Sequence, residues 1–457
     1  MPPAASTTRS RWVLAAVSTA LFCVQIDYFA MNLALPRMAR DLHSSSTDLQ
    51  WVISVYMLTL GAFMVPAGRI GDVLGRRRAL LGGIALFAVA SVFCALAPSV
   101  GAVVIFRALQ GLGAAFIFPV SVSVLTNAFP AARAAGAIGW AYGIAGLGNA
   151  AGPVFGGLLT QTVGWRWVFW LLVPLAASAF AIGALTITES SDSTVPRRID
   201  VTGLALITIG IGLFTLTFDR ASAWGWLSPA TIAAFIVSAG LLVAFVIAER
   251  RIRWPLVDLS LLRDSRFVVV VVAGTVCNIA YAITIYLSTL NLQQVRGLDP
   301  LVAGLAFLGP SAGAAIGGVL SGRLATRLAP LVVVGGTGVL AAISLAALAI
   351  TDDWVPYLSA LTMCGFTMGL VYAFTTVATQ AVVPPERAGA AAGLTLTSLV
   401  TFAGVGVAVS GAVLEMLQQR GMSMGGGITA ILLVLAAVLL PASAAVLCYR
   451  RRPASAD

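Results

Sequence analysis

Long blocks of apolar residues dominate the chain and alternate with short polar stretches. An α-helix of ~20 apolar residues crosses a hydrocarbon core of about 30 Å, whereas a transmembrane barrel needs short segments of alternating polarity. The blocks have the length of helices and show no such alternation. They predict an all-α integral membrane protein with about fourteen transmembrane helices, at residues 12–35, 50–67, 79–97, 101–123, 137–160, 167–187, 201–218, 229–248, 267–292, 301–321, 329–350, 355–379, 388–414 and 428–448.

The distribution of arginine predicts how these spans are oriented. An even number of spans places both termini on one side. If that side is the cytoplasm, 20 arginines fall in cytoplasmic segments, six in outer loops and one, Arg107, inside a span. Because basic residues accumulate in cytoplasmic loops, we expect a multi-pass protein of the bacterial inner membrane with both termini in the cytoplasm. This topology, together with contact to anionic membrane lipid, accounts for the net charge of +10 and requires no nucleic-acid partner.

Two pairs of matching loops indicate an internal repeat. Gly68-Arg69 recurs as Gly322-Arg323, and the pattern Pro-x-x-Arg-Ala recurs at Pro130 and Pro384, each at an offset of 254 residues. Parallel repeats of this kind hold a substrate site near the bilayer midplane, at the interface between them. The expected domains are an N-terminal six-helix bundle at 1–187, an inserted helix pair with a cytoplasmic linker at 188–266, and a C-terminal six-helix bundle with a short tail at 267–457.

Composition excludes several classes of function. Of all residues, 59% are hydrophobic and 10% charged, and all 27 basic residues are arginine. Without lysine the chain has no Walker phosphate loop and no Schiff-base amine. The single histidine, His43, and five dispersed cysteines predict neither a metal site nor a disulfide. Asp352-Asp353, the one adjacent acidic pair, has no ligand residues nearby, so we expect neither an enzyme nor a cofactor.

The first span contains Asp27, the one carboxylate clearly inside any predicted span. Intramembrane acids are rare and mark ion or substrate pathways. Asp27 can therefore take up and release a proton as its surroundings change sides. The alternative is a structural hydrogen bond to a neighbouring helix. Asn32 follows five residues later, in the same span.

Arg107 lies a few residues inside the fourth span. An arginine at this depth costs about 2.5–3.5 kcal/mol on insertion scales, so it usually faces a cavity or a partner. The alternative is a side chain that extends to water at the outer end of its helix.

Two further stretches carry a recognisable chemistry. The loop after the second span reads GRIGDVLGRRR from Gly68, and it contains Asp72, Gly75 and Arg76. Its glycines permit tight turns and close helix contact, and Asp72 can bind a helix N-terminus or an arginine. The loop is therefore either a latch between the two bundles or an ordinary solvated turn.

The fifth span is rich in small residues and carries one proline. Its small and special residues include Gly148, Gly152, Pro153, Gly156 and Gly157. Glycine at this density produces a flat face for close helix contact, and the proline removes one backbone hydrogen bond.

These stretches resemble the signatures of the major facilitator superfamily. The loop from Gly68 is similar to Gly-x-Leu-Ala-Asp-Arg-x-Gly-Arg-Arg-Arg, with Val73 in place of a basic residue. The resemblance implies a cytoplasmic gate at Gly68, Asp72, Gly75 and Arg76, an arginine implicated in proton coupling at Arg107, and the antiporter motif at Gly148, Gly152, Pro153, Gly156 and Gly157. The first span resembles that of the fourteen-helix drug:proton antiporters, which implies a proton or cation site at Asp27, with Asn32 nearby.

The resemblance implies a fold of two six-helix bundles plus an inserted pair, and export of a small lipophilic molecule in exchange for protons. The expected partners are the substrate, protons and membrane lipid, and the expected energy source is the proton gradient; we expect a monomer. A lipophilic cation that pairs with Asp27 and a neutral natural product held by apolar walls both fit. The alternative function is proton-coupled import of a nutrient or metabolite, against which the motif of the fifth span counts.

Overall fold

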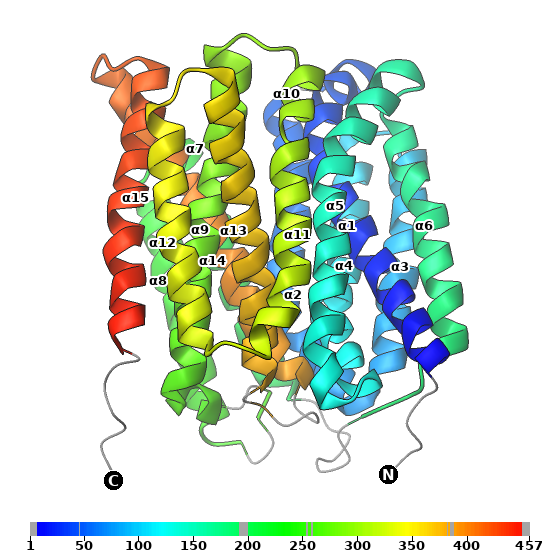
Figure 1. Ribbon diagram of the computed structural model, residues 1–457. Coiled ribbons are helices and arrows are strands. Elements are labelled where there is room, and N and C mark those ends of the chain that lie inside the picture. The colour runs from blue at the N-terminus through cyan, green and yellow to red at the C-terminus, as the bar shows by residue number, and fades with distance from the viewer. Residues whose placement is uncertain are drawn as a thin grey trace.

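The computed structural model describes residues 7–44, 46–191, 200–252, 255–256, 259–381, 383 and 388–449. These residues form helices and loops, with no strand among them, so the predicted all-α class is confirmed. The long helices run side by side, and α1 begins at the same end of the molecule at which α15 ends (Figure 1). We call this the termini end, and the opposite one the far end. The elements are α1 (Thr7–Asp41), α2 (Ser46–Leu74), α3 (Arg76–Leu96), α4 (Val100–Ala128), α5 (Ala131–Thr162), α6 (Arg166–Thr186), α7 (Val201–Trp224), α8 (Pro229–Glu249), η1 (Leu259–Arg263), α9 (Ser265–Leu290), η2 (Asn291–Val295), α10 (Pro300–Ala306), α11 (Leu308–Ala325), α12 (Pro330–Ile350), α13 (Trp354–Ala381), α14 (Ala388–Gln419) and α15 (Met424–Tyr449).

Thirteen segments of the described chain are long and apolar enough to cross a membrane. Helix α5 is not among them although it has 32 residues and lies within the bundle (Figure 1). Eight of those residues are glycine, which adds length without hydrophobicity. With α5, the described helices correspond to the fourteen predicted spans.

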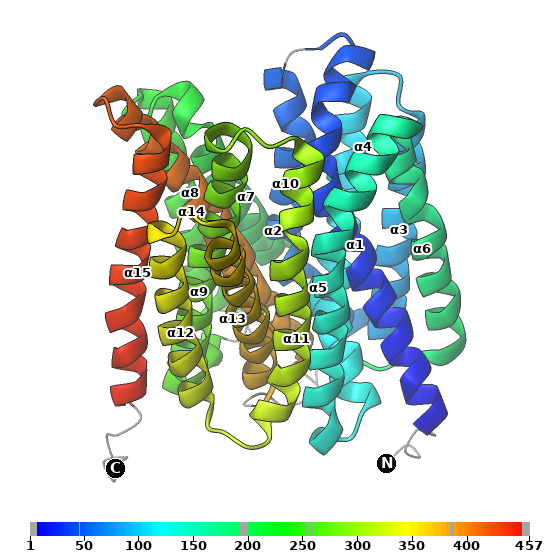
Figure 2. The same ribbon diagram turned by 45° about the horizontal axis from the view of Figure 1, so that its top comes forward.

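Helices α1 to α6 pack mainly on one another, as do α9 to α15, and we refer to these groups as the N-terminal and C-terminal bundles. In the first group α1 lies on α5 and α6, and α4 lies on α2 and α3. In the second, α11 and α12 lie on α13, and α12 also lies on α15. The two bundles meet along α5 and α11 and along α2 and α14 (Figures 1 and 2). The exact domain boundaries remain a prediction.

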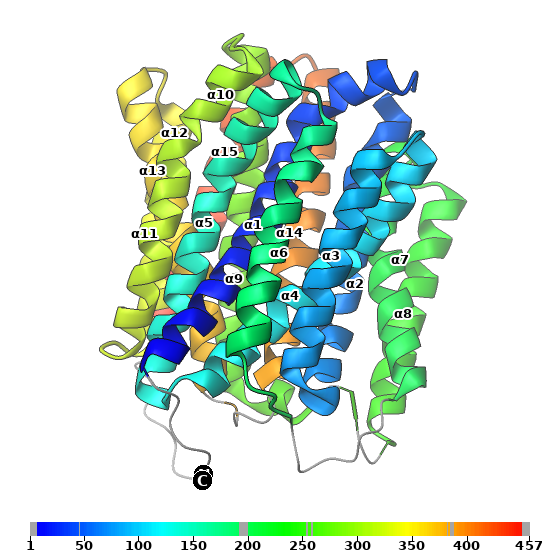
Figure 3. The same cartoon turned by 90° about the vertical axis from the view of Figure 1, so that its right-hand side faces the viewer.

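The inserted pair, α7 and α8, lies beside α2 at the edge of the molecule (Figure 3). Both polar and apolar contacts attach it to α2. The Ser54 hydroxyl donates a hydrogen bond of 2.9 Å to Asp219, the Arg220 guanidinium lies 3.7 Å from the centre of the Trp51 ring, and Val65 belongs to an apolar cluster with residues of α7 and α8. Helix α7 also contacts α14 of the C-terminal bundle. It therefore covers the junction of α2 and α14.

Two spans differ from the predicted uninterrupted helices. The span at 301–321 divides into α10 and α11 at Phe307. Pro310 lies four residues after Ala306 and has no N–H to donate to its carbonyl, which explains the break. Helix α9 continues at the far end into η2, a single π-helical turn. The segment 255–267, which leads into α9, includes the short 3-10 helix η1, and residues 257–258 lie outside the described part.

Glycine permits the close approach of α5 and α11. A Cβ atom added at Gly139 would lie 2.8 Å from the carbonyl oxygen of Gly318 and 3.0 Å from the amide nitrogen of Gly322. Both distances are shorter than ordinary van der Waals contact, so the backbones touch without side chains between them. The same helix contains Gly136, at which an added Cβ would meet nothing within 4 Å.

We therefore expect Gly139→Ala to destabilise the protein by about 1–3 kcal/mol, the usual cost of overpacking. Gly136→Ala, one helical turn away, is the matched control and should leave stability unchanged or slightly higher. Thermal melting of the purified protein in detergent measures both. Equal melting temperatures for the two variants would show that the bundles do not depend on this contact.

Candidate functional site

A buried ion pair joins α1 to α4 inside the N-terminal bundle. Nη1 of Arg107 lies 2.8 Å from Oδ1 and 2.7 Å from Oδ2 of Asp27. Asp27 is 0% exposed and Arg107 is 1% exposed. The sequence left open a position of the Arg107 side chain at the membrane surface, but the structure places the guanidinium in the interior. The two charges singled out separately from the sequence are therefore partners.

Neighbouring polar groups form further hydrogen bonds with this pair. Arg107 also donates hydrogen bonds to the side-chain oxygen of Gln110, at 2.7 Å, and to the carbonyl oxygen of Val52, at 3.0 Å. Gln110 in turn donates to the Ser91 hydroxyl on α3, at 2.8 Å. The ring of Tyr56 on α2 lies 4.0 Å from the guanidinium carbon of Arg107. Four helices thus supply groups to one charged cluster.

Sequence analysis did not assign roles to Gln110, Ser91 and Tyr56. One signal was available for Gln110, because it lies three residues after Arg107 and shares its helix face. Ser91 and Tyr56 lie on other helices, and uncharged polar residues are frequent in the spans. Asn32, predicted to lie near this site, belongs to α1, but its side chain is outside the described part of the structure.

Glycines of α5 bring α1 close to its neighbour on both sides of Asp27. Added Cβ atoms would lie 2.9 Å from the Phe22 carbonyl oxygen at Gly148, and 3.0 Å from the Ile26 carbonyl oxygen at Gly152. At Gly156 the added atom would lie 2.7 Å from the carbonyl oxygen of Ala30. The predicted antiporter motif is therefore the surface on which the Asp27 segment of α1 packs.

The other two residues of this motif are Pro153 and Gly157. Pro153 faces α10, since an added Cβ at Gly304 would lie 3.2 Å from it, and Gly157 is buried.

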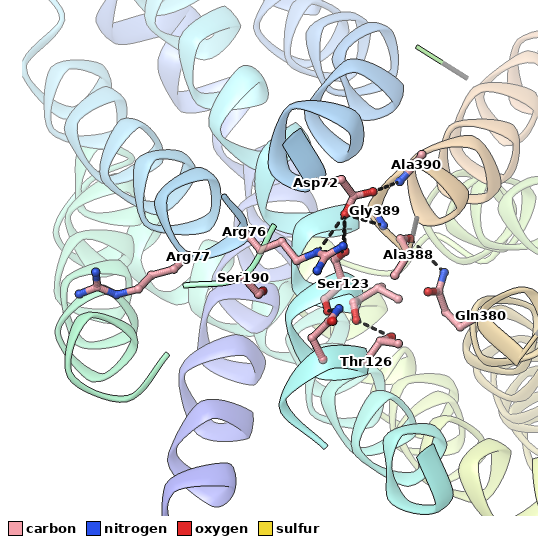
Figure 4. A network of polar contacts seen from close by, with 12 residues as sticks. Asp72, Arg76, Arg77, Ser123, Thr126, Ser190, Gln380, Ala388, Gly389 and Ala390 are labelled. Atoms are coloured by element: carbon pink, nitrogen blue, oxygen red, sulfur yellow. Dashed lines mark hydrogen bonds and ion pairs between the residues drawn. The ribbon is translucent and has the colours of Figure 1, made fainter. Parts of the chain in front are cut away.

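A second polar cluster lies at the termini end, where α2 meets α14 (Figure 4). The Asp72 carboxylate accepts hydrogen bonds from the backbone amides of Gly389, at 3.2 Å, and Ala390, at 2.8 Å. It also pairs with Arg76, whose Nη2 lies 2.7 Å from Oδ1, and it accepts a bond of 3.1 Å from the Ser123 hydroxyl. We call this cluster the latch.

The latch uses the free amides at the start of α14. The first N–H groups of a helix have no partner within it and carry the positive end of the helix dipole. A carboxylate at this position is stabilised by both effects. Because Asp72 belongs to the N-terminal bundle and the amides to the C-terminal bundle, the latch fastens the two bundles at the termini end.

The other predicted gate residues lie around this carboxylate. Gly68 faces Gly389 so closely that a Cβ atom at either position would overlap the other backbone. Gly75 has a φ of 119°, a conformation that side chains rarely adopt, and it precedes the first residue of α3. Arg76 is 1% exposed, and its amide donates to the carbonyl oxygen of Ser190. The structure thus brings Gly68, Asp72 and Arg76 together and favours the latch over a solvated turn.

The sequence model of the Major Facilitator Superfamily matches residues 17–408. The multidrug resistance protein Stp of Mycobacterium tuberculosis (strain ATCC 25618 / H37Rv) is 33% identical over 406 residues, which cover 88% of this chain and 75% of that protein. The tetracenomycin C resistance and export protein of Streptomyces glaucescens is 32% identical over 428 residues, which cover 90% of this chain and 77% of that protein. The crystal structure of the human organic anion transporter MFSD10 (TETRAN) covers 98% of this chain and 100% of its own, with a TM-score of 0.68 and 16% identity, a likeness of fold.

The ion pair predicts non-additive effects of substitution. Removing one partner of a buried pair typically costs about 3–5 kcal/mol, because the other charge is left unpaired. We expect Asp27→Asn and Arg107→Gln each to destabilise strongly, and the double variant to cost less than the sum. Unfolding of the purified proteins measures the three free energies, with exposed Arg133→Gln as a control. Additive free energies would mean that the two side chains do not interact.

The latch predicts faster hydrogen exchange in Asp72→Asn. Loss of a charged acceptor weakens a hydrogen bond by about 1.5–3 kcal/mol, so the amides of Gly389 and Ala390 should exchange roughly tenfold faster or more. Mass-spectrometric exchange on the purified protein measures this region. Asp299→Asn, at an exposed far-end position, is the control and should leave those amides unaffected. Unchanged exchange in Asp72→Asn would exclude the latch in solution.

Proposed function

The chain belongs to the Major Facilitator Superfamily, and we propose that it exports a small lipophilic drug or natural product across the bacterial inner membrane in exchange for protons. The observation that carries the proposal is the buried pair of Asp27 and Arg107. The pair supplies a titratable acid inside a membrane transporter. The names of the similar proteins, which include resistance and export proteins, support the direction of transport.

Proton coupling follows from the chemistry of the pair. While Asp27 is ionised, it holds Arg107 through both carboxylate oxygens. Addition of a proton to Asp27 removes the negative charge, so the guanidinium loses its main partner and the link between α1 and α4 weakens. Protonation and the arrangement of these helices are therefore linked, and each changes the free energy of the other.

The latch defines one of the two conformational states of the proposed transport cycle. Under the predicted topology the termini end faces the cytoplasm, so the intact latch corresponds to closure on that side. Asp27 is buried in this state, so its exchange of protons with the outside requires a movement at the far end, whereas release of the latch opens the cytoplasmic side to substrate. Alternating access is then a rocking of the two bundles about their long contact along α5 and α11.

The substrate is proposed to be lipophilic and uncharged or cationic. A lipophilic cation competes with Arg107 for the Asp27 carboxylate and couples to the proton directly. A neutral natural product binds to apolar and aromatic side chains, and Asp27 then carries the proton alone. The two classes predict different behaviour, because only a cation loses affinity when Asp27 is neutralised.

Everted membrane vesicles test the proposal. The vesicle interior is acidified, candidate compounds of both classes are added outside, and proton release is followed with a pH-sensitive dye. We expect an active compound to collapse the pH gradient with the unsubstituted protein and not with Asp27→Asn. Asp299→Asn is the matched control and should transport normally, because it removes a carboxylate from an exposed position.

The outcomes separate the mechanism from the function. A compound that acts on the unsubstituted protein and on Asp27→Asn alike would overturn Asp27 as the proton site while leaving export in place. Uptake of the compound together with protons, measured in right-side-out vesicles, would overturn export in favour of import. Binding of a radiolabelled active compound to Asp27→Asn distinguishes the substrate classes, because a cation should lose affinity and a neutral compound should keep it.

A further inference from the structure

A cavity of about 450 Å³ lies within the C-terminal bundle, at the far end. It is bounded by the ends of α9 and α12, by η2, and by the beginnings of α13 and α15. This volume falls in the range of small-molecule sites in proteins. The cavity belongs to one bundle and not to the contact between the two, so it is distinct from the pair of Asp27 and Arg107.

A positively charged group is held in place at this cavity. The Arg296 guanidinium lies 4.3 Å from the centre of the Tyr357 ring and 4.8 Å from that of Trp354. Such stacking occupies the faces of the guanidinium and leaves its N–H groups at the edge. The guanidinium makes no hydrogen bond with any described residue. A cation that is fixed in position but lacks an acceptor is a binding group for an anion such as phosphate.

Uncharged polar groups lie deeper in the same cavity. The Ser288 hydroxyl is buried, and within the described chain it has no hydrogen-bond partner. A buried hydroxyl without a partner is costly unless a ligand or water satisfies it. Asn291 begins the π-helical turn η2 and donates a 3.3 Å hydrogen bond to the Tyr357 hydroxyl. Isolated π-helical turns occur frequently at functional sites, where they redirect side chains.

An acidic residue lines the cavity, and exposed apolar residues are next to its lining residues in the chain. Asp352 lines it and is exposed, so one boundary of the cavity is anionic and another is cationic. Ile350 and Val355 are adjacent in the chain to lining residues and are 74% and 76% exposed. Large apolar side chains exposed at the end of transmembrane helices lie against lipid rather than water.

We propose that this cavity binds the headgroup of a zwitterionic phospholipid. Arg296 binds the phosphate, Asp352 binds the ammonium group, and the acyl chains lie along the apolar surface of α12 and α15. Because Arg296 and Asp352 both line the cavity, a ligand with one anionic and one cationic group matches its charges better than a ligand with a single charge. The proposal does not depend on the direction of transport, because it concerns a site within one bundle.

Lipid binding to the purified full-length protein tests the proposal. The melting temperature in detergent is measured with added phosphatidylethanolamine, phosphatidylglycerol or soluble phosphoethanolamine, and native mass spectrometry counts the bound lipids. We expect phosphatidylethanolamine to stabilise most. Arg296→Gln and Asp352→Asn should each weaken its binding roughly tenfold or more, the loss caused by removal of a charged hydrogen-bond partner. Arg37→Gln, on α1 near the far end, is the matched control and should bind normally.

A third variant tests the occupied volume without altering any charge. Gly425 lines the cavity, and a Cβ added there would meet only Val295, at 3.4 Å. Gly425→Leu should therefore fold normally and exclude the lipid. Equal stabilisation by phosphatidylglycerol, with no effect of Asp352→Asn, would overturn the zwitterionic headgroup. Equal stabilisation by soluble phosphoethanolamine would overturn a lipid as the ligand. Undiminished lipid binding by Gly425→Leu would overturn the location.

Discussion

A carboxylate and a guanidinium inside a membrane find little water to solvate them, so the charges of Asp27 and Arg107 must compensate each other. Much of the N-terminal bundle is arranged around this constraint. Helix α1 supplies the acid, α4 the base, and the glycine face of α5 holds α1 in place. Tyr56 of α2 and Ser91 of α3 complete the cluster. A change in the charge of one residue therefore alters the packing of five helices.

The fold was largely predictable from hydrophobic periodicity, because helices that cross a membrane must satisfy their own backbone groups. The number of the spans, their order and their helical structure were all predicted from the apolar blocks. The break at Phe307 and the π-helical turn at Asn291 did not, since they depend on how single carbonyl groups are satisfied. Pro310 was a usable signal for the break at Phe307. No local sequence pattern marks the π-helical turn at Asn291.

The site was predictable in its charged residues and not in its geometry. Asp27 and Arg107 were identifiable because charge is rare in the spans, but 80 residues separate them and no spacing rule pairs them. Val73 stands where the superfamily signature has a basic residue, and its side chain is buried. It carries no charge, so the cation paired with Asp72 in the latch is Arg76. The sequence indicated that Asp72 could bind a helix N-terminus but not which one, because the partners on α14 are peptide groups that every residue except proline possesses.

That use of peptide groups makes the latch unequal in its two sides. One side requires the carboxylate at position 72, whereas the opposite side requires the smallness of Gly389 and the start of a helix. The corresponding loop at 322–327 lacks an acid, and under this arrangement it needs none. One acidic copy of the motif therefore suffices for this contact, and the two halves of the chain contribute unlike groups to it.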